Sequence, residues 1–329
     1  MEELTRQEEL AAWEEPEGRE NMAKQGTAEE KTDMVAEQVG ATEKPDTPVR
    51  APGSRPQSFR ERWEAWEGLG AGTIKLIAVI SMLIDHTAAG ILGRYLNQLG
   101  IRAYLFAQDP AVTAAWMEQY GWLYGLYGFM RSVGRLAFPI YCYFLVEGLK
   151  YTRNRWKYLA RLSVFALISE IPFDLLFNNA ILEFHSQNVY FTLAISLAVL
   201  IGMREVEQKS RQRGNSPVNF LLASGFQLGI FAAGCVLAAF LKTDYSYRGV
   251  VCTVIIYLFS KNRIQQLLAG AVAFCWELPA APLAFLPLAL YKKKRGLNLK
   301  YFFYAFYPVH LLVLYLIARW LGIWRLPAL

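Results

Sequence analysis

Two histidines lie inside long apolar runs of this sequence, where ionisable side chains are rare. Asp85 and His86 interrupt the run KLIAVISMLIDHTAAGILGR, and His310 follows Tyr-Pro in YAFYPVHLLVLYL. Ionisable groups are costly in hydrocarbon, so those that a membrane helix retains usually pair, line a cavity or do chemistry. A neutral imidazole is a suitable general base near neutral pH. The sequence therefore predicts proton transfer at His86, whereas His310 has a structural role in an unwound turn as its alternative.

Two arginines lie in the next apolar run. Arg131 and Arg135 are four residues apart, which puts them on one face if a single helix continues through both. Two interpretations stay open at this point. Either the arginines pair internally with a carboxylate, or they bind an anionic ligand. The candidate carboxylates are Asp85, Glu170 and Asp174.

The other polar residues in apolar surroundings have simpler interpretations. Glu147 lies beside a basic loop, and we expect it to be a local ion-pair partner. Glu170 and Asp174 share one helical face in LISEIPFDLLF. Asp244 and Glu277 lie at predicted span ends, where we expect interface residues.

Known catalytic sequence patterns are missing. There is no Ser-His-Asp spacing, no Gly-rich phosphate loop and no Cys/His metal pattern, and the four cysteines lie in apolar runs. We therefore predict no metal site. Adjacent helical residues point about 100° apart, so Asp85 and His86 each need a partner from another helix. Any chemistry must be assembled from separate helices.

The composition indicates a membrane protein with an acidic tail. The chain is 54% hydrophobic and 19% charged over 329 residues. Residues 1–72 hold 17 acidic against 9 basic residues, whereas the remainder holds 11 against 25. The basic residues lie between apolar runs, as in membrane proteins, so we expect membrane lipids and no nucleic acid as partners.

The predicted fold is an all-α, polytopic transmembrane bundle of about 8–10 spans. A span needs about 20 apolar residues, so the runs at 248–260 and 280–291 are short. Two interpretations stay open. Either these short runs are partial spans, or the stretch 264–291 is a bent or re-entrant pair that is broken by Pro279, Pro282 and Pro287. The apolar runs are 74–93, 121–149, 158–177, 188–203, 218–241, 248–260, 264–278, 280–291 and 301–321.

Two domains are expected. Residues 1–72 form a disordered acidic tail, because they hold too few aromatic and β-branched residues to fold. Within it, 55–68 is either a juxtamembrane helix or a solvated linker. Residues 73–329 form the membrane domain.

The basic loops predict an orientation. Fifteen Lys and Arg lie in the loops at 150–157, 204–213, 261–263 and 292–300, against three in the opposite loops: Arg102, Lys242 and Arg248. Positive loops face the cytoplasm. We therefore expect a cytoplasmic N-terminus, an external C-terminus and an external stretch at 97–120 that holds an interfacial helix.

Several sequence blocks resemble the TraX family of conjugation-associated membrane proteins, whose best-known activity is N-terminal acetylation of pilin. The blocks, which run from about Thr73 to Leu321, are KLIAVISMLIDH, GRLAFPIYCYFLVEG, LISEIPFDLLF, QNVYFTLAISLAVLIG and KYFFYAFYPVHLLVLYLI. The resemblance implies an acetyltransferase of the cytoplasmic (inner) membrane that uses acetyl-CoA, distantly similar to other polytopic acyltransferases. The family positions that match are Asp85, His86, Arg135, Glu147, Glu170, Asp174 and His310.

On this basis we expect His86, Asp85 and Arg135 to be catalytic. His86 is the base, Asp85 orients it or a partner group, and Arg135 stabilises the oxyanion. Arg131, Arg135 and His310 are expected to bind the donor acetyl-CoA. The acceptor, whether a protein, a glycan or a lipid, stays open. The competing interpretation is a membrane transporter or an assembly scaffold without catalysis.

Overall fold

The computed structural model describes residues 68–106, 109–214, 216–294, 296 and 300–328. The predicted disordered tail and its juxtamembrane segment lie outside the described residues, apart from residues 68–72. Within the described part all regular elements are helices, so the predicted all-α fold is confirmed.

The helices follow the apolar runs along the chain. Their bounds are α3 Ala71–Thr87, a π-helical turn Ala88–Leu92, α4 Gly93–Gln98, α5 Ile101–Phe106, α6 Pro110–Gly134, α7 Ala137–Tyr151, α8 Arg155–Phe177, α9 Val189–Gln212, α10 Pro217–Phe240, α11 Ser246–Leu258, α12 Arg263–Ala273, a 3₁₀ turn Cys275–Glu277, α13 Ala280–Leu283, α14 Phe285–Ala289 and α15 Lys300–Trp320. Side-chain caps from Asp109, Asn154, Asn188 and Asn262 accept N–H bonds where α6, α8, α9 and α12 begin.

Among the described residues, four helical stretches are long and apolar enough to cross a membrane. They are Ala71–Gln98, Val189–Gln212, Pro217–Phe240 and Phe302–Trp320. The stretch that holds His86 and the one that holds His310 are both in this group. The protein is therefore an integral membrane protein whose candidate chemical groups lie on membrane-spanning helices.

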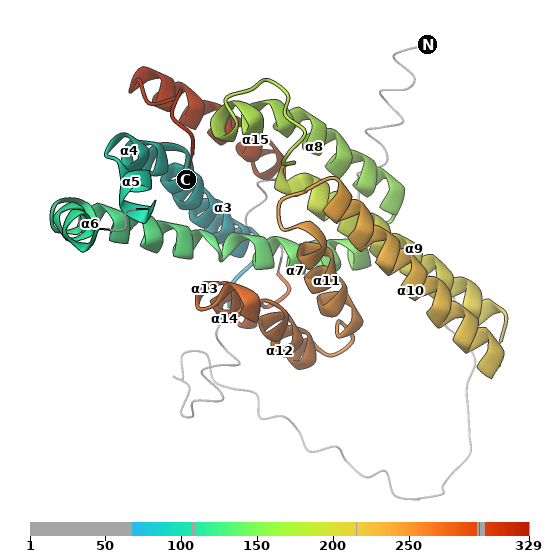
Figure 1. The fold of residues 1–329 in the computed structure, drawn as a ribbon. Helices are drawn as coiled ribbons and strands as arrows, with labels where there is room; N and C mark the ends of the chain where they lie inside the picture. The colour runs from blue at the N-terminus through green and yellow to red at the C-terminus, as the bar shows by residue number, and fades with distance from the viewer. Residues whose placement is uncertain (1–67, 107–108, 215, 295, 297–299, 329) are drawn as a thin grey trace, which may run out of the picture. The chain divides into compact units, whose positions relative to one another are not determined.

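The helices pack around α9 and α3 (Figure 1). Helix α9 contacts α7, α8, α10 and α11, while α3 contacts α6, α7 and α15. More than half of the apolar window of α9 is buried, whereas that of α10 is almost entirely exposed. An apolar helix that exposes nearly all of its sides is typical of a position facing lipid.

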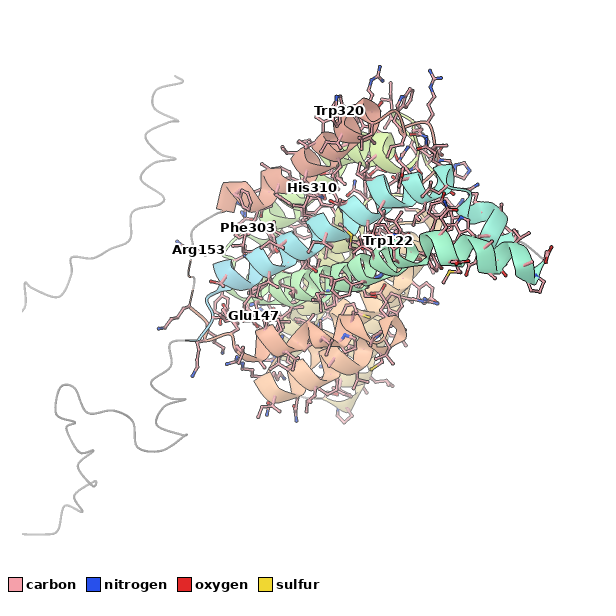
Figure 2. The ribbon with its side chains drawn as sticks, turned by 90° about the vertical axis from the view of Figure 1, so that its left-hand side faces the viewer. Trp122, Glu147, Arg153, Phe303, His310 and Trp320 are labelled. Carbon is pink, nitrogen blue, oxygen red and sulfur yellow. The ribbon has the colours of Figure 1, made fainter. Side chains whose placement is uncertain are left out.

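One end of the bundle gathers the predicted basic loops, and we call it the basic end. Lys150 donates to the Ser260 carbonyl at 3.0 Å, and Arg155 pairs with Glu205 at 2.7 Å. The backbone of Leu69, just before α3, pairs with residues 290 and 292. Figure 2 shows Arg153 and Glu147 toward this end, with His310 between them and Trp320. Loops that are far apart in sequence thus meet at one end, as the positive-inside count requires.

The stretch from α12 to α14 is a re-entrant pair, which was one of the two predicted alternatives. Arg263, where α12 begins, donates to the Ala289 carbonyl at 2.8 Å, where α14 ends. Both ends of the hairpin therefore lie at the basic end. Helix α12 has 11 residues, or about 16 Å of rise, which is roughly half of a hydrocarbon core. At the tip of the hairpin, Glu277 pairs with Arg135, whereas its neighbours Trp276 and Leu278 are exposed.

Helix α6 differs from the prediction. The expected interfacial helix within 97–120 is partly merged into it, because α6 runs without interruption from Pro110 to Gly134. A break follows at Arg135 and Leu136, before α7 begins at Ala137. Arg131 therefore lies in the last turn of α6 and Arg135 is the C-cap residue of that helix, in a helical conformation. The single span predicted over 121–149 is divided at this point into α6 and α7.

A buried arginine links three segments at the end of the bundle opposite the basic end. Arg94 on α4 is fully buried and donates to the carbonyls of Leu176, Trp324 and Leu326 and to the side chain of Asn179. A guanidinium satisfies several carbonyls at once because its five N–H donors spread in a plane. Arg94 thereby joins α4, the end of α8 and the segment that follows α15.

Candidate functional site

His86 and His310 form a hydrogen-bonded pair. His86 Nδ1 lies 2.7 Å from His310 Nε2, although the residues are 224 positions apart. His310 Nδ1 lies 2.7 Å from the Phe306 carbonyl oxygen. A carbonyl can only accept, so His310 carries its proton on Nδ1, and its Nε2 must accept from His86 Nδ1. His86 is therefore the Nδ1–H tautomer, and its Nε2 keeps a free lone pair.

Helix packing positions this pair. Helices α3 and α15 are in contact, and the pair bridges them. The His86 ring also lies edge-on to Phe177 and Tyr307, with ring centroids 5.5 and 5.9 Å away. A π-helical turn begins two residues after His86, a feature that is frequent at functional sites. The imidazole is thus held by neighbours on two other helices, α8 and α15.

A cavity of about 180 Å³ lies next to His86. Charged, aromatic and small side chains line it from α3, the π-helical turn, α6, α7, α8, the start of α9 and the loop before α11: Met82, Asp85, His86, Ala89, Arg131, Gly134, Arg135, Ala137, Phe138, Tyr141, Phe173, Phe177, Val189, Asp244 and Tyr245. His310 is not among these residues. Because His86 lines the cavity while its Nδ1 is engaged by His310, the free Nε2 is the nitrogen available to a ligand.

The two arginines of the cavity are both paired. Arg131 Nη1 lies 2.7 Å from Asp85 Oδ2, and Arg135 Nη1 lies 3.1 Å from Glu277 Oε1. Arg135 also shares a side-chain hydrogen bond with Tyr245. Internal pairing, one of the two predicted alternatives, is therefore present. Asp85 is the only one of the three predicted partners that pairs with an arginine in the described structure.

A glycine allows Asp85 to reach Arg131. A Cβ placed on Gly134 would lie 2.2 Å from the Asp85 Cβ, so α3 and α6 approach closely at this point. The Ser81 hydroxyl donates to the Val133 carbonyl one α3 turn earlier. Only a residue without a side chain fits at position 134 without moving Asp85.

Asp244 and Glu277 both lie at helix ends, as predicted, and both also lie beside the arginines. Asp244 is in the loop between α10 and α11 and lines the cavity. Glu277 is in the 3₁₀ turn after α12 and pairs with Arg135. Their proximity to the arginines was not predicted.

The remaining predicted residues lie outside the cavity. Glu147 pairs with Lys150 at 2.7 Å, as predicted for a local partner. Glu170 accepts from the backbone and side chain of Asn188, and Asp174 accepts from Asn178 and from the Glu183 N–H. Glu170 and Asp174 thus hold the loop between α8 and α9 in place, close to the cavity wall at Val189.

Several residues of the site carried no signal in the sequence. Tyr245 and Tyr307 are two of 18 tyrosines in a chain of which 14% is aromatic. Their contacts with Arg135 and His86 depend on the tertiary packing. The position of Tyr245 just before α11, in a left-handed conformation with φ 64°, is visible only in the structure.

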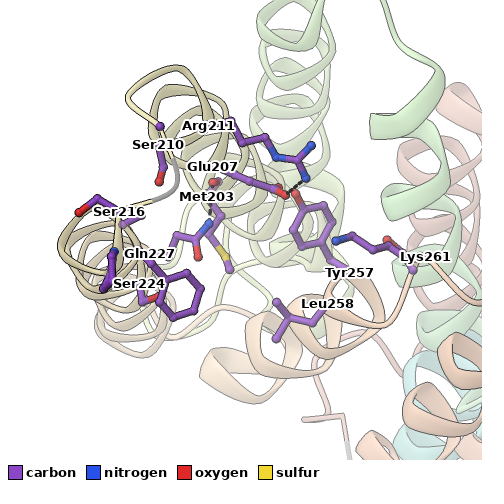
Figure 3. A pocket seen from close by; sticks show the side chains of 15 residues that line it. Met203, Glu207, Ser210, Arg211, Ser216, Ser224, Gln227, Tyr257, Leu258 and Lys261 are labelled. Carbon is purple, nitrogen blue, oxygen red and sulfur yellow. Dashed lines mark hydrogen bonds and ion pairs between the residues drawn. The ribbon is translucent and has the colours of Figure 1, made fainter.

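A second cavity, of about 630 Å³, lies at the basic end (Figure 3). Met203, Glu207 and Arg211 form one wall on a single face of α9, with Phe220 and Gln227 of α10 opposite. Arg211 and Glu207 form an ion pair at 2.7 Å. Lys261, after α11, also lines this cavity, which therefore combines cations with an apolar floor.

The first cavity can support acid–base chemistry. It presents an imidazole nitrogen with a free lone pair, and a second imidazole fixes its tautomer. The paired arginines lie on the same cavity, where they can stabilise developing negative charge. The described residues include no cluster of three His, Cys, Asp or Glu that could hold a metal ion.

Comparison with known proteins adds a family and a relative. Residues 71–318 match the family model described as TraX protein. The chain is 29% identical over 271 residues to a protein of Dichelobacter nodosus described as "Probable fimbrial assembly protein FimC, serogroup H1". That alignment covers 73% of this chain and 92% of the relative. No solved structure matches the chain.

Proposed function

Because the chain belongs to the TraX family, we propose that it is an integral membrane acyltransferase that moves an acetyl group from acetyl-CoA to an amine or hydroxyl acceptor. The observation that carries the proposal is the histidine pair. It presents an unprotonated Nε2 of His86 to a cavity between membrane helices. A base of fixed tautomer is what an acyl transfer to an N–H or O–H acceptor requires.

The proposed reaction balances without a cofactor. The acceptor nitrogen or oxygen attacks the thioester carbonyl carbon, while His86 Nε2 takes the acceptor proton. The carbon–sulfur bond then breaks, and the imidazolium returns the proton to the leaving thiolate. His310 accepts the hydrogen bond from His86 Nδ1 throughout and stabilises the imidazolium.

Arg135 and Arg131 are the proposed oxyanion donors. Each is already paired with a carboxylate, which holds the guanidinium in place before the reaction. Asp85 acts through Arg131 in this proposal, and it does not orient His86, because its Oδ2 lies on the guanidinium. The predicted catalytic set is kept, with His310 moved from donor binding to positioning the base.

The nucleotide part of the donor requires a different site. The cavity of about 180 Å³ is smaller than typical ligand sites of roughly 300–1,000 Å³. It has room for the acetyl thioester alone. We infer that the phosphates of acetyl-CoA bind cations at the basic end, where Arg211 and Lys261 line the larger cavity.

The proposed location is the cytoplasmic (inner) membrane, with the basic end and the N-terminus on the cytoplasmic side. The gathering of the basic loops at one end supports this orientation. Acetyl-CoA would then approach from the cytoplasm. The resemblance to the TraX family and the fimbrial name of the relative support a pilin-like subunit, acetylated at its N-terminus, as the acceptor.

The test is acetyl transfer by the purified protein in lipid nanodiscs, with peptide, glycan and lipid acceptors. We expect acceptor-dependent release of CoA, and we expect His86→Ala and Arg135→Ala to lower the rate by roughly 10²-fold or more. His185→Ala is the matched control, because His185 is an exposed loop histidine. It contacts Glu183, and neither residue lines the cavity. Unchanged transfer by His86→Ala would refute the assignment of the base. No turnover with any acceptor would favour a scaffold in filament assembly.

A further inference from the structure

The larger cavity at the basic end adjoins a smaller polar one. The polar cavity, of about 310 Å³, is lined by Lys150, Arg204, Glu207, Gln208, Arg211 and Tyr257. Glu207, Arg211 and Tyr257 also line the larger cavity (Figure 3), so the two are neighbours beside α9. We call the two cavities together the α9 groove.

The charges of the α9 groove do not cancel. Its lining holds four cationic side chains and one carboxylate: Lys150, Arg204, Arg211 and Lys261, against Glu207. Lys150 pairs with Glu147 and Arg211 pairs with Glu207. Arg204 and Lys261 form no ion pair within the described part of the chain. The groove therefore keeps two uncompensated positive charges, which attract an anion.

These two cations have donors to offer to a ligand. The half-buried Arg204 donates from Nη1 to the Leu149 carbonyl at 3.1 Å. A guanidinium has five N–H donors, so the others can bind phosphate oxygens. Lys261 is exposed, and its ammonium on a flexible stem can approach the same anion.

The larger cavity adds an apolar wall that opens toward lipid. Phe220 and Leu258 line it and are 73% and 57% exposed. Phe220 lies on α10, whose apolar window is 6% buried, as in a helix that faces lipid. The cations alone would suit any phosphate. The wall suits a phosphate that carries an acyl chain, because a chain from the bilayer keeps these apolar side chains from water.

We propose that the α9 groove binds one anionic phospholipid from the leaflet at the basic end. Its phosphate lies on Arg204 and Lys261, and an acyl chain lies along Phe220 and Leu258. Basic pockets between membrane helices on the cytoplasmic side bind acidic headgroups in this way. The inference goes beyond the proposed acyl transfer. Because Lys261 is also assigned to the phosphates of acetyl-CoA, the lipid and acetyl-CoA compete for the groove.

The test counts lipids bound to the full chain in detergent by native mass spectrometry. The probes are dioleoyl phosphatidylglycerol, which is anionic, and dioleoyl phosphatidylcholine, which has the same chains and no net charge. We expect selective binding of phosphatidylglycerol, and we expect Arg204→Gln and Lys261→Gln each to weaken it about fivefold. Arg153→Gln is the matched control and should leave the affinity unchanged, because Arg153 is exposed at the same end but does not line the groove.

Lys261→Gln also guards against misfolding, because the Lys261 side chain is exposed. Equal affinity for the two lipids would overturn the inference. So would equal phosphatidylglycerol affinity in wild type and in folded Lys261→Gln, or a groove that binds acetyl-CoA and no selective lipid.

A competition experiment separates this inference from the proposed function. Displacement of phosphatidylglycerol by acetyl-CoA supports the shared groove, whereas lipid that stays bound keeps the lipid site and removes acetyl-CoA from the groove. If phosphatidylglycerol binds selectively but no acetyl transfer occurs with any acceptor, the lipid site stands and the proposed function falls. If transfer occurs without selective lipid binding, the reverse holds.

Discussion

At the scale of single residues, the state of His86 depends on His310. The Phe306 carbonyl fixes the His310 proton on Nδ1, and His310 in turn fixes the His86 proton on Nδ1. The same arrangement of a base oriented by a second group operates in serine hydrolases, where the orienting group is a carboxylate. A neutral imidazole in that position orients the base and adds no charge to the cavity.

His310→Phe removes the acceptor for His86 Nδ1 and keeps a ring of similar size. We expect kcat to fall by roughly 10²-fold with little change in KM, because His310 does not line the cavity. His310→Gln offers an amide oxygen to His86 Nδ1 and should recover part of the loss. Steady-state kinetics check this. Equal rates for wild type and His310→Phe would show that the second histidine does not position the first.

At the scale of elements, the site depends on the close approach of α3 and α6. Gly134→Ala would place a methyl group 2.2 Å from the Asp85 Cβ, so Asp85 or the helix must shift. Such overpacking typically costs about 1–3 kcal/mol. We expect a lower thermal midpoint of unfolding in nanodiscs, together with a loss of acetyl transfer, because the pair between Asp85 and Arg131 is disturbed.

Gly128→Ala is the control on the same helix, because a Cβ there meets nothing within 4 Å. It should keep the wild-type midpoint or raise it slightly, since alanine favours helix. Equal midpoints and equal activities for the two variants would mean that the contact at Gly134 relaxes without consequence.

The hairpin of α12 to α14 and the short helix α11 each place a carboxylate near the arginines. Both have one end at the basic end, and the segments at their other ends place Glu277 and Asp244 beside the arginines. Short apolar runs in the sequence were the visible sign of this arrangement.

At the scale of the whole molecule, the gathered basic loops predict one orientation. In a background with the exposed Cys275 replaced by serine, a cysteine is introduced at Arg153 at the basic end or at the exposed Leu182 in the loop between α8 and α9. We expect a membrane-impermeant maleimide to label Leu182→Cys in intact cells. Arg153→Cys should react only after permeabilisation, because positive loops stay in the cytoplasm. The reverse pattern would invert the proposed topology.

The amino-acid sequence by itself determined the membrane class, the all-α fold and the family, because hydrophobic run lengths and block motifs are local properties. It also singled out His86, Arg135 and a local ion pair of Glu147, since charged groups in apolar runs stand out and the partner, Lys150, is only three residues away.

Only the tertiary structure decided which of these groups meet. His310 reaches His86 across 224 positions, Glu277 pairs with Arg135 from the segment after α12, and Asp244 lines the cavity from the loop before α11. The helical periodicity of apolar residues indicates which face of a helix is apolar, but it does not indicate how deep that face lies or which helix packs on it. Depth and neighbours come from packing between helices that are distant in the chain, and this packing brought together the two histidines and the paired arginines.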